Sequence, residues 1–211
     1  YKRQVQYLYK KLQRDGQLER DVDRLVRNDR IAWGSSMIAC NDADAMVTGN
    51  IRHYAASIEK LKKVVDSRPG EEIFGMTMMV SKGKTILVAD TNVVDFPTAE
   101  RLANVSTSCV RVARLFGFEP KVAFLSHSTF GKPVSKNTKH VRDAIELLKT
   151  KKVDFDFDGE MQPDVALNPI YQEIYPFSKI VGNANILIMP ALHSAAISTK
   201  LMKSFGGAKL I

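Results

Sequence analysis

Apolar residues recur at helical spacing through the first forty residues of the chain. Val5, Leu8 and Leu12 would share one face of a helix, and a second apolar series at positions 18, 22, 25 and 26 follows Gly16. Residues 31–39 continue the same period with small side chains, as a buried helix would. This spacing predicts a helical beginning.

From residue 44 onward, short apolar runs alternate with longer amphipathic stretches. The runs predict strands at residues 44–47, 73–80, 85–89, 122–125, 153–157 and 186–189, with another beginning at 209–211. The stretches predict helices at residues 51–65, 98–116, 138–149, 169–175 and 191–205. Alternation of this kind is typical of an α/β fold with mostly parallel sheets. We expect two α/β subdomains, at residues 1–93 and 94–211, joined near residues 92–97.

Several of the predicted strands end in small or polar residues. The clearest case is the run 122–125, which is followed by Ser126, Ser128, Thr129 and Gly131. Similar endings occur at residues 48–49, 90–91, 158–164 and 190–194. Ligands in open α/β sheets bind outside the carboxyl ends of the strands, so these endings together predict a binding site.

The segment 126–131 has the groups that a phosphate would need. Its hydroxyls and backbone N–H groups can donate to phosphate oxygens, and Gly131 allows close approach. It contains neither a Walker A sequence nor a G-x-G-x-x-G fingerprint. The alternative is a turn whose hydroxyls satisfy its own backbone, and the sequence alone leaves both interpretations open.

Other candidate groups carry weaker signals. Asp158, Glu160 and Asp164 could bind Mg²⁺ or act as a base, but helix capping together with ion pairs to nearby lysines is the favoured interpretation. His127 and His193 follow predicted strands, where a base could reach a ligand. Because no H-x-x-x-H spacing exists, we expect no metal site.

Composition narrows the choice of partners. The chain has 211 residues, 45% of them hydrophobic, and 31 Lys and Arg against 23 Asp and Glu give a net charge of +8. This charge suits an anionic ligand, but no nucleic-acid-binding motif accompanies it, so we expect no nucleic acid partner.

The cysteines and the absence of targeting signals indicate the compartment. Two isolated cysteines, and the lack of a signal peptide or membrane-spanning run, indicate a cytoplasmic protein without a membrane partner. The first residue is not Met and residues 209–211 resemble a strand start, so we expect a fragment of a longer chain.

Six segments in order resemble the phosphate acetyltransferase and phosphate butyryltransferase family. They are Ala43-Asp-Ala-Met-Val-Thr-Gly49, Asp90-Thr-Asn with Pro97-Thr-Ala-Glu100, Phe116-Gly-Phe-Glu-Pro-Lys-Val-Ala123, Leu125-Ser-His-Ser-Thr129, Asp158-Gly-Glu-Met-Gln-Pro-Asp-Val-Ala166 and Ala184-Asn185. Three further segments resemble the C-terminal, acetyltransferase-like domain of bacterial NADP-dependent malic enzymes. These are Tyr7-Leu-Tyr-Lys-Lys-Leu-Gln-Arg-Asp-Gly16, residues 159–162 and Ala191-Leu-His-Ser-Ala-Ala-Ile-Ser198.

The resemblance implies a fold like that of isocitrate and isopropylmalate dehydrogenases, with a ligand cleft between two domains. It implies acetyl-CoA, CoA or acetyl phosphate as the ligand, without an obligatory cofactor. NADP and a divalent metal would bind only to the malate-oxidising domain of the same parent chain. Acetyl-CoA bound to the present domain would regulate that malate-oxidising domain. A homo-oligomer is expected, as a dimer or larger. The alternative is an active phosphate acetyltransferase, which makes acetyl-CoA from acetyl phosphate and CoA.

Two departures from the family bear on activity. The family segment that supplies a catalytic serine and arginine would lie downstream of Ile211. Either the parent chain carries that segment there or the malic-enzyme type has lost it, so no catalytic residue is assigned here. Stand-alone acetyltransferases usually carry Gly-Pro-Leu-Gln where this chain has Gly-Glu-Met-Gln at 159–162. The residues expected to bind the ligand are Thr48, Gly49, Arg52, Ser126, Ser128, Thr129, Gly131, Asp158 and His193.

Overall fold

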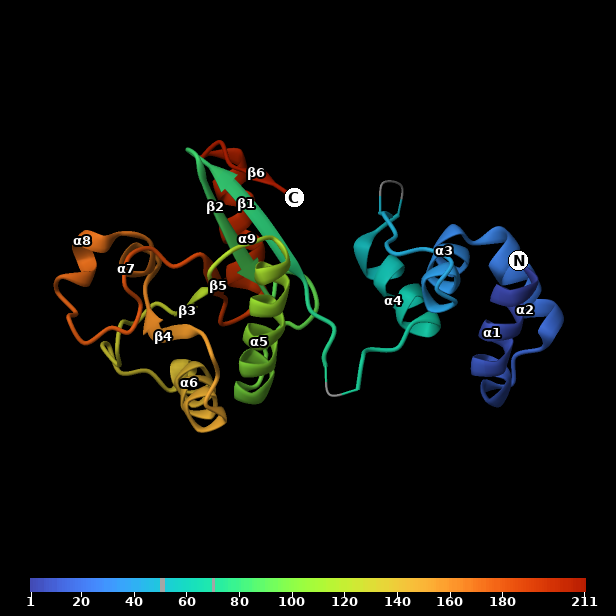
Figure 1. Cartoon of the computed structure of the whole chain (residues 1–211), viewed down its shortest axis with the longest axis horizontal. Coiled ribbons are helices and arrows are strands. Elements are labelled where there is room, and N and C mark those ends of the chain that lie inside the picture. The colour runs from blue at the N-terminus through green and yellow to red at the C-terminus, as the bar shows by residue number, and fades with distance from the viewer. Residues whose placement is uncertain (50–51, 70) are drawn as a thin grey trace. The chain divides into compact units, whose positions relative to one another are not determined.

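The computed structural model describes residues 1–49, 52–69 and 71–211 and divides the chain into two compact units. Unit 1 is Tyr1–Arg68 and unit 2 is Pro69–Ile211 (Figure 1). The sequence had placed the division between residues 93 and 94. The difference arises because the hairpin of residues 76–89 pairs with a strand of unit 2 and belongs to that unit's sheet.

Unit 1 is helical over its described residues. It contains α1 (Lys2–Leu12), the 3-10 turn η1 (Gln13–Asp15), α2 (Glu19–Asn28), α3 (Arg30–Ala39) and α4 (Tyr54–Val64). The apolar faces predicted by the spacing meet in one small core, formed by Val5, Leu8, Val22, Val26, Ala32 and Val64. Ile51, where the sequence predicted this helix to begin, lies outside the described residues, as does Asn50.

The strand predicted at residues 44–47 is absent, and the prediction was wrong. These residues have no regular secondary structure, and the Val47 side chain is fully exposed. A strand needs a partner to satisfy its backbone, and this run has none among the described residues of unit 1. The α/β character predicted for both halves therefore applies to unit 2.

Unit 2 is built on one six-stranded sheet in the order β4-β3-β5-β2-β1-β6. The strands are β1 (Met76–Ser81), β2 (Lys84–Ala89), β3 (Lys121–Leu125), β4 (Asp156–Met161), β5 (Ile186–Ile188) and β6 (Lys209–Leu210). β4, β3, β5 and β2 pair in parallel, whereas β1 pairs antiparallel with β2 and β6. The predicted α/β fold, mostly parallel sheet and hairpin are confirmed.

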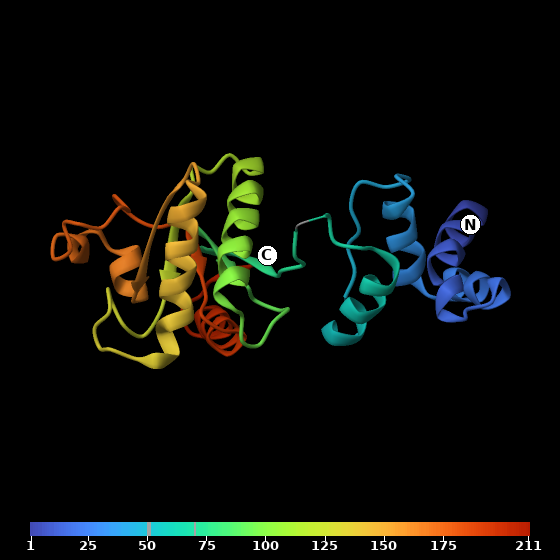
Figure 2. The same ribbon diagram turned by 90° about the horizontal axis from the view of Figure 1, so that it is seen from below.

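Helices cover both faces of this sheet because alternate strand residues point to opposite sides. The helices are α5 (Ala99–Leu115), α6 (Lys139–Lys151), α7 (Pro163–Leu167), α8 (Pro169–Gln172) and α9 (Leu192–Ser204), with the 3-10 turn η2 (Lys136–Thr138) before α6. Leu87 and Phe124 share a core with residues of α5 and α6. Val88 and Leu125 share a second core with residues of α7 and α9. Figure 2 shows α5 and α6 side by side over one face of the sheet.

The main departure within unit 2 is β4. The sequence predicted a strand at 153–157 ending in a loop at 158–160, but β4 runs from Asp156 to Met161 and includes those polar residues. β4 lies at one edge of the sheet, where polar strand residues are tolerated. Glu160 is therefore in a strand, where its side chain can point into the protein.

Candidate functional site

The carboxyl ends of four parallel strands meet at one edge of the unit 2 sheet. Phe124 of β3 is in register with Ile188 of β5, which is in register with Ala89 of β2. The residues that follow these strands, 90–91, 126–131 and 189–194, therefore emerge together, with Gln162 after β4. The edge predicted to hold a ligand site does gather the polar loops of this unit.

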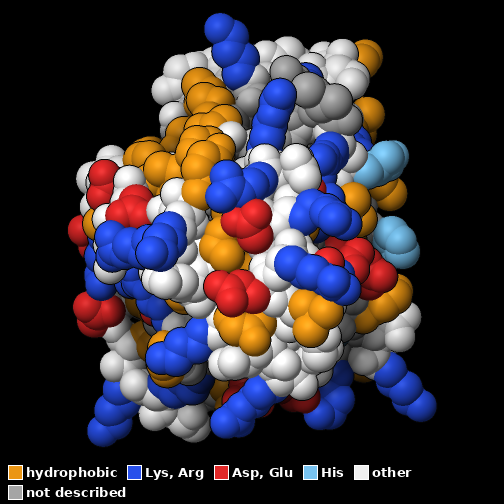
Figure 3. All heavy atoms as spheres, turned by 90° about the vertical axis from the view of Figure 1, so that its right-hand side faces the viewer, with side chains coloured by type: hydrophobic (Ala, Val, Ile, Leu, Met, Phe, Trp, Pro, Cys, Tyr) orange, Lys and Arg blue, Asp and Glu red, His pale blue; other side chains and the backbone are white. Residues whose placement is uncertain are grey.

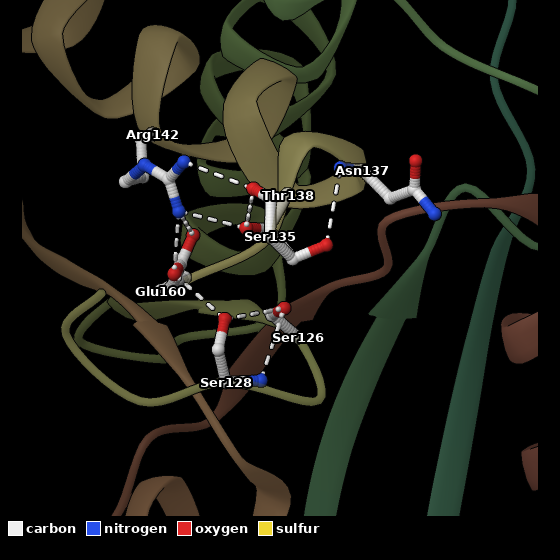
Figure 4. A network of polar contacts seen from close by, with 7 residues as sticks. All are labelled: Ser126, Ser128, Ser135, Asn137, Thr138, Arg142 and Glu160. Carbon is white, nitrogen blue, oxygen red and sulfur yellow. Dashed lines mark hydrogen bonds and ion pairs between the residues drawn. The ribbon is translucent and has the colours of Figure 1, made fainter. Parts of the chain in front are cut away.

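A buried carboxylate organises the loop after β3. The Ser128 hydroxyl donates to Oε1 of Glu160 at 2.7 Å, and the Ser126 and Ser128 hydroxyls share a hydrogen bond at 3.1 Å (Figure 4). The Ser128 and Glu160 residues have no exposed surface, and Ser126 is 7% exposed. The loop hydroxyls therefore point into the protein toward a carboxylate.

Arg142, from the first turn of α6, neutralises this carboxylate. Its Nη1 lies 2.9 Å from Oε1 and 3.1 Å from Oε2 of Glu160. The same guanidinium donates to the Thr138 hydroxyl at 2.7 Å and to the Ser135 carbonyl at 3.2 Å (Figure 4). Its side chain is 36% exposed, so the cluster reaches solvent on the Arg142 side. The favoured interpretation placed this cluster in ion pairs with nearby lysines, but Glu160 pairs instead with Arg142, an arginine of another element.

The remaining candidates of this loop and of β4 hold backbone in place. The Thr129 hydroxyl accepts from the Gln162 amide at 3.2 Å. Gly131 has φ +84°, a conformation that L side chains rarely adopt. The Asp158 carboxylate accepts from the amides of Gly159 at 2.9 Å and Lys179 at 2.7 Å. Thr129 and Asp158 thus support the loop and strand, and Gly131 permits the turn.

His193 lies at the same edge, in the first turn of α9. Its ring is exposed and makes an edge contact with Phe96, with centroids 5.9 Å apart. After β2, the buried carboxylate of Asp90 accepts from the amides of Gly75, Asn92 and Val93. The edge therefore combines an accessible imidazole with carboxylates that hold loops.

The other three candidates lie in unit 1. Thr48, Gly49 and Arg52 line a surface cavity of about 690 Å³, together with Trp33, Met46 and neighbouring residues of α2 and α3. Nη1 of Arg52 lies 2.7 Å from Oδ2 of Asp29. The candidate set is thus divided, with three residues on the cavity of unit 1 and six on unit 2.

Asp29 lies beside this cavity as a carboxylate with two cationic partners, and the sequence analysis did not identify it. It caps α3 by accepting from the amides of Ile31 and Ala32, and it pairs with Arg52 and Lys60. Burial alone would raise the pKa of this carboxyl, but the hydrogen bonds from Lys60, Arg52 and the two amides lower it well below its ordinary value. The Asp before a predicted helix is a cap signal, but its cationic partners are distant in sequence.

Arg142 was also missed, because its partner lies on another element 18 residues away.

The side chains of Asp158, Glu160 and Asp164 do not gather into one acidic cluster. Over residues 1–49, 52–69 and 71–211, no three His, Cys, Asp or Glu side chains gather as a metal site would require. Within the same ranges, no helix is long and apolar enough to cross a membrane. Figure 3 shows Lys and Arg side chains dispersed among acidic and neutral ones on the face drawn.

An α/β unit with polar loops at the carboxyl ends of its parallel strands defines a class of ligand-binding proteins. The comparisons give the family: the chain matches phosphate acetyl/butaryl transferase over residues 1–211 and belongs to that family. The chain is 45% identical to an NADP-dependent malic enzyme of Rhizobium meliloti (strain 1021), over 97% of this chain and 27% of that protein. It is 34% identical to a phosphate acetyltransferase of Treponema pallidum (strain Nichols), over 85% of this chain and 57% of that protein.

A solved structure agrees with this assignment. The phosphotransacetylase from Streptococcus pyogenes has a TM-score of 0.87 at 26% identity, over 99% of this chain and 64% of that one. The chain thus spans about a quarter of the length of the malic enzyme relative and nearly two thirds of this structural neighbour.

Proposed function

We propose that this chain is the phosphotransacetylase-like domain of a bacterial NADP-dependent malic enzyme and that it binds acetyl-CoA as a regulatory ligand. The observation that carries the proposal is the pattern of relatedness. A chain that matches the acyltransferase family throughout is 45% identical to a malic enzyme, of which it covers only 27%. The parent chain would also contain a malate-oxidising domain. The whole protein would be cytoplasmic and would assemble as a homo-oligomer.

The geometry of the carboxyl edge supports ligand binding without assigning a catalytic group. The loops after β2, β3 and β5 emerge together, and the net charge of +8 suits the phosphates of CoA. Binding in this domain would change malate oxidation through coupling between two sites of the parent protein. NADP and the divalent metal would act in the other domain.

Calorimetric titration of the chain with acetyl-CoA, CoA and acetyl phosphate tests the proposal. We expect micromolar binding of acetyl-CoA and no acetyl-CoA formation from acetyl phosphate and CoA. An absence of binding for all three ligands would contradict the proposal that this chain holds the site.

A matched pair of serine variants locates the ligand. Ser128→Ala should weaken acetyl-CoA binding by about 1–2 kcal/mol, because the loop would lose the bond that positions it against Glu160. Ser106→Ala is the control, since Ser106 is equally buried but bonds to the Ala103 carbonyl within α5. Equal affinities for both variants would exclude the loop from the site.

The alternative function is an active phosphate acetyltransferase. The hydroxyl-rich loop at 126–131 and the relationship to the Treponema pallidum phosphate acetyltransferase favour it. Steady turnover of acetyl phosphate and CoA by this chain would establish the alternative and contradict a purely regulatory role.

A further inference from the structure

A histidine in the first turn of α6 reaches the loop that follows β5. Nε2 of His140 lies 3.0 Å from the Pro190 carbonyl oxygen. A carbonyl oxygen can only accept a hydrogen bond, so Nε2 carries the hydrogen and donates it. Both residues are half-buried, where water competes weakly for the two groups. The bond therefore ties α6 to the segment at 189–194.

The same turn of α6 also holds β4 and the segment that follows β3. Arg142 pairs with Glu160 of β4 and donates to the Ser135 carbonyl, and Glu160 accepts from the Ser128 hydroxyl (Figure 4). His140 adds the third contact, to the loop after β5. One helical turn thus contacts, directly or through Glu160, the polar segments of three parallel strands.

We propose that His140 is a positioning residue of the carboxyl edge, which fixes the loop at 189–194 against α6 and so places it for an acyl-CoA. The inference rests on the proposed function, because acetyl-CoA is the ligand proposed for that edge. His140 acts through the Pro190 carbonyl and needs no contact of its own with the ligand.

The backbone amides of this loop tie it to the β2 side of the sheet. The amide of Met189 donates to the Ala89 carbonyl at 2.7 Å, and the amide of Leu192 donates to the Asp95 carbonyl at 3.1 Å. Both acceptors belong to β2 or to the segment after it. Pairing of β5 with β3 stops at the last residue of β5, so beyond that residue the imidazole of α6 holds the loop toward the other side.

The position of this loop decides where an accessible imidazole lies. His193 follows Pro190 closely, in the first turn of α9, and its ring contacts Phe96 with centroids 5.9 Å apart. Groups that bind a ligand must be held to within about 0.5 Å of the productive geometry. A loop released from α6 would let this ring and the amides beside it move, so acetyl-CoA affinity would fall.

Two substitutions of His140 separate positioning from packing. In His140→Ala we expect the amides at 191–193 to exchange hydrogen about tenfold faster, because the loop opens more often. Acetyl-CoA, titrated by calorimetry, should bind this variant about three- to tenfold more weakly, which is the effect of one lost hydrogen bond. His140→Gln should restore both values to within about twofold of the wild type, because its carboxamide also donates.

Lys139→Ala is the matched control. Lys139 lies in the same turn of α6, but it pairs with Asp143 of the same helix. The control variant should exchange hydrogen and bind acetyl-CoA as the wild type does.

Three results would overturn the proposal. One is unchanged hydrogen exchange at 191–193 in His140→Ala. Another is an equal loss in His140→Ala and His140→Gln, which would assign the imidazole a packing role. The third comes from the wild type and needs no variant to fold, because long-range proton–nitrogen spectra report which ring nitrogen carries the hydrogen. A hydrogen on Nδ1 alone would exclude the bond to Pro190.

The same measurements keep this proposal apart from the proposed function. Wild type that binds acetyl-CoA, with equal affinity and exchange in His140→Ala, would contradict the role of His140 alone. Faster exchange in His140→Ala and recovery in His140→Gln, with no acetyl-CoA binding by the wild type, would contradict the regulatory function and leave His140 as the residue that fixes the loop.

Discussion

Removal of the Arg142 guanidinium should destabilise unit 2, because this guanidinium is the ion-pair partner of a fully buried carboxylate. Arg142→Met keeps part of the aliphatic stem but removes both contacts to Glu160, at 2.9 and 3.1 Å. The Glu160 carboxylate, with no exposed surface, would keep only the Ser128 hydroxyl. The variant therefore leaves a buried charge without its counterion.

The expected cost is about 3 kcal/mol in the free energy of unfolding. Breaking a buried pair by removing one partner costs about 3–5 kcal/mol. The lower end applies because the Arg142 side chain is 36% exposed and water already screens part of the attraction. A loss of this size corresponds to a fall of about 6–12 °C in Tm.

Urea unfolding followed by far-UV circular dichroism and by amide hydrogen exchange in β3 and β4 measures this cost. Fluorescence of Trp33, the chain's one tryptophan, is less suitable because that residue lies in unit 1. Adding Glu160→Gln should restore about 2 kcal/mol, since a carboxamide is less costly to bury than a carboxylate. A cost below about 1 kcal/mol for Arg142→Met, or no rescue by the second change, would refute the reasoning.

Three further predictions concern other parts of the chain. Gly159→Ala should cost about 3 kcal/mol or more, because the residue has φ +144° and its new Cβ would lie 2.6 Å from the Phe124 carbonyl oxygen; thermal unfolding with normal stability would contradict this. The lowered pKa of Asp29 stabilises the fold above the unfolded-state pKa of about 3.9, and the stabilisation is lost as pH falls below it. In Asp29→Asn the free energy of unfolding should therefore vary less with pH between about pH 5 and pH 2, as measured by acid titrations followed by Trp33 fluorescence. An unchanged pH dependence would exclude Asp29 as the source of the acid-sensitive stability. Burial raises the pKa of Cys109 to about 12, so in a Cys40→Ser variant a disulfide reagent at pH 8 should label the native protein only as fast as it unfolds.

Much of the fold followed from local pattern. Apolar spacing predicted helix over the residues of α1, α2 and α3, although it joined α2 and α3 into one helix that the structure divides at Asp29. The hairpin of β1 and β2 was predicted from two runs separated by four residues. Thr98 was recognised as the cap of α5, where its hydroxyl accepts from the Arg101 amide. These features depend on residues close in sequence, so the sequence carries their full signal.

The errors occurred where tertiary neighbours decide the structure. Residues 44–47 have the apolar content of a strand but no strand beside them in unit 1. β4 extends through Asp158 and Glu160, which sequence rules assign to a loop, because an edge strand tolerates polar residues and Arg142 receives the carboxylate. In both places the deciding contact lies outside the local window.

The family, the alternation of strands and helices in unit 2, and the polar loops at 90–91, 126–131 and 190–194 could be read from the sequence alone. Only the tertiary structure showed that β2, β3, β4 and β5 bring those loops to one edge. Only the structure showed that the Ser128 hydroxyl is held by Glu160 and Arg142. The reason is physical: periodicity encodes which face of an element is buried, whereas an ion pair between elements is set by the packing of the whole unit.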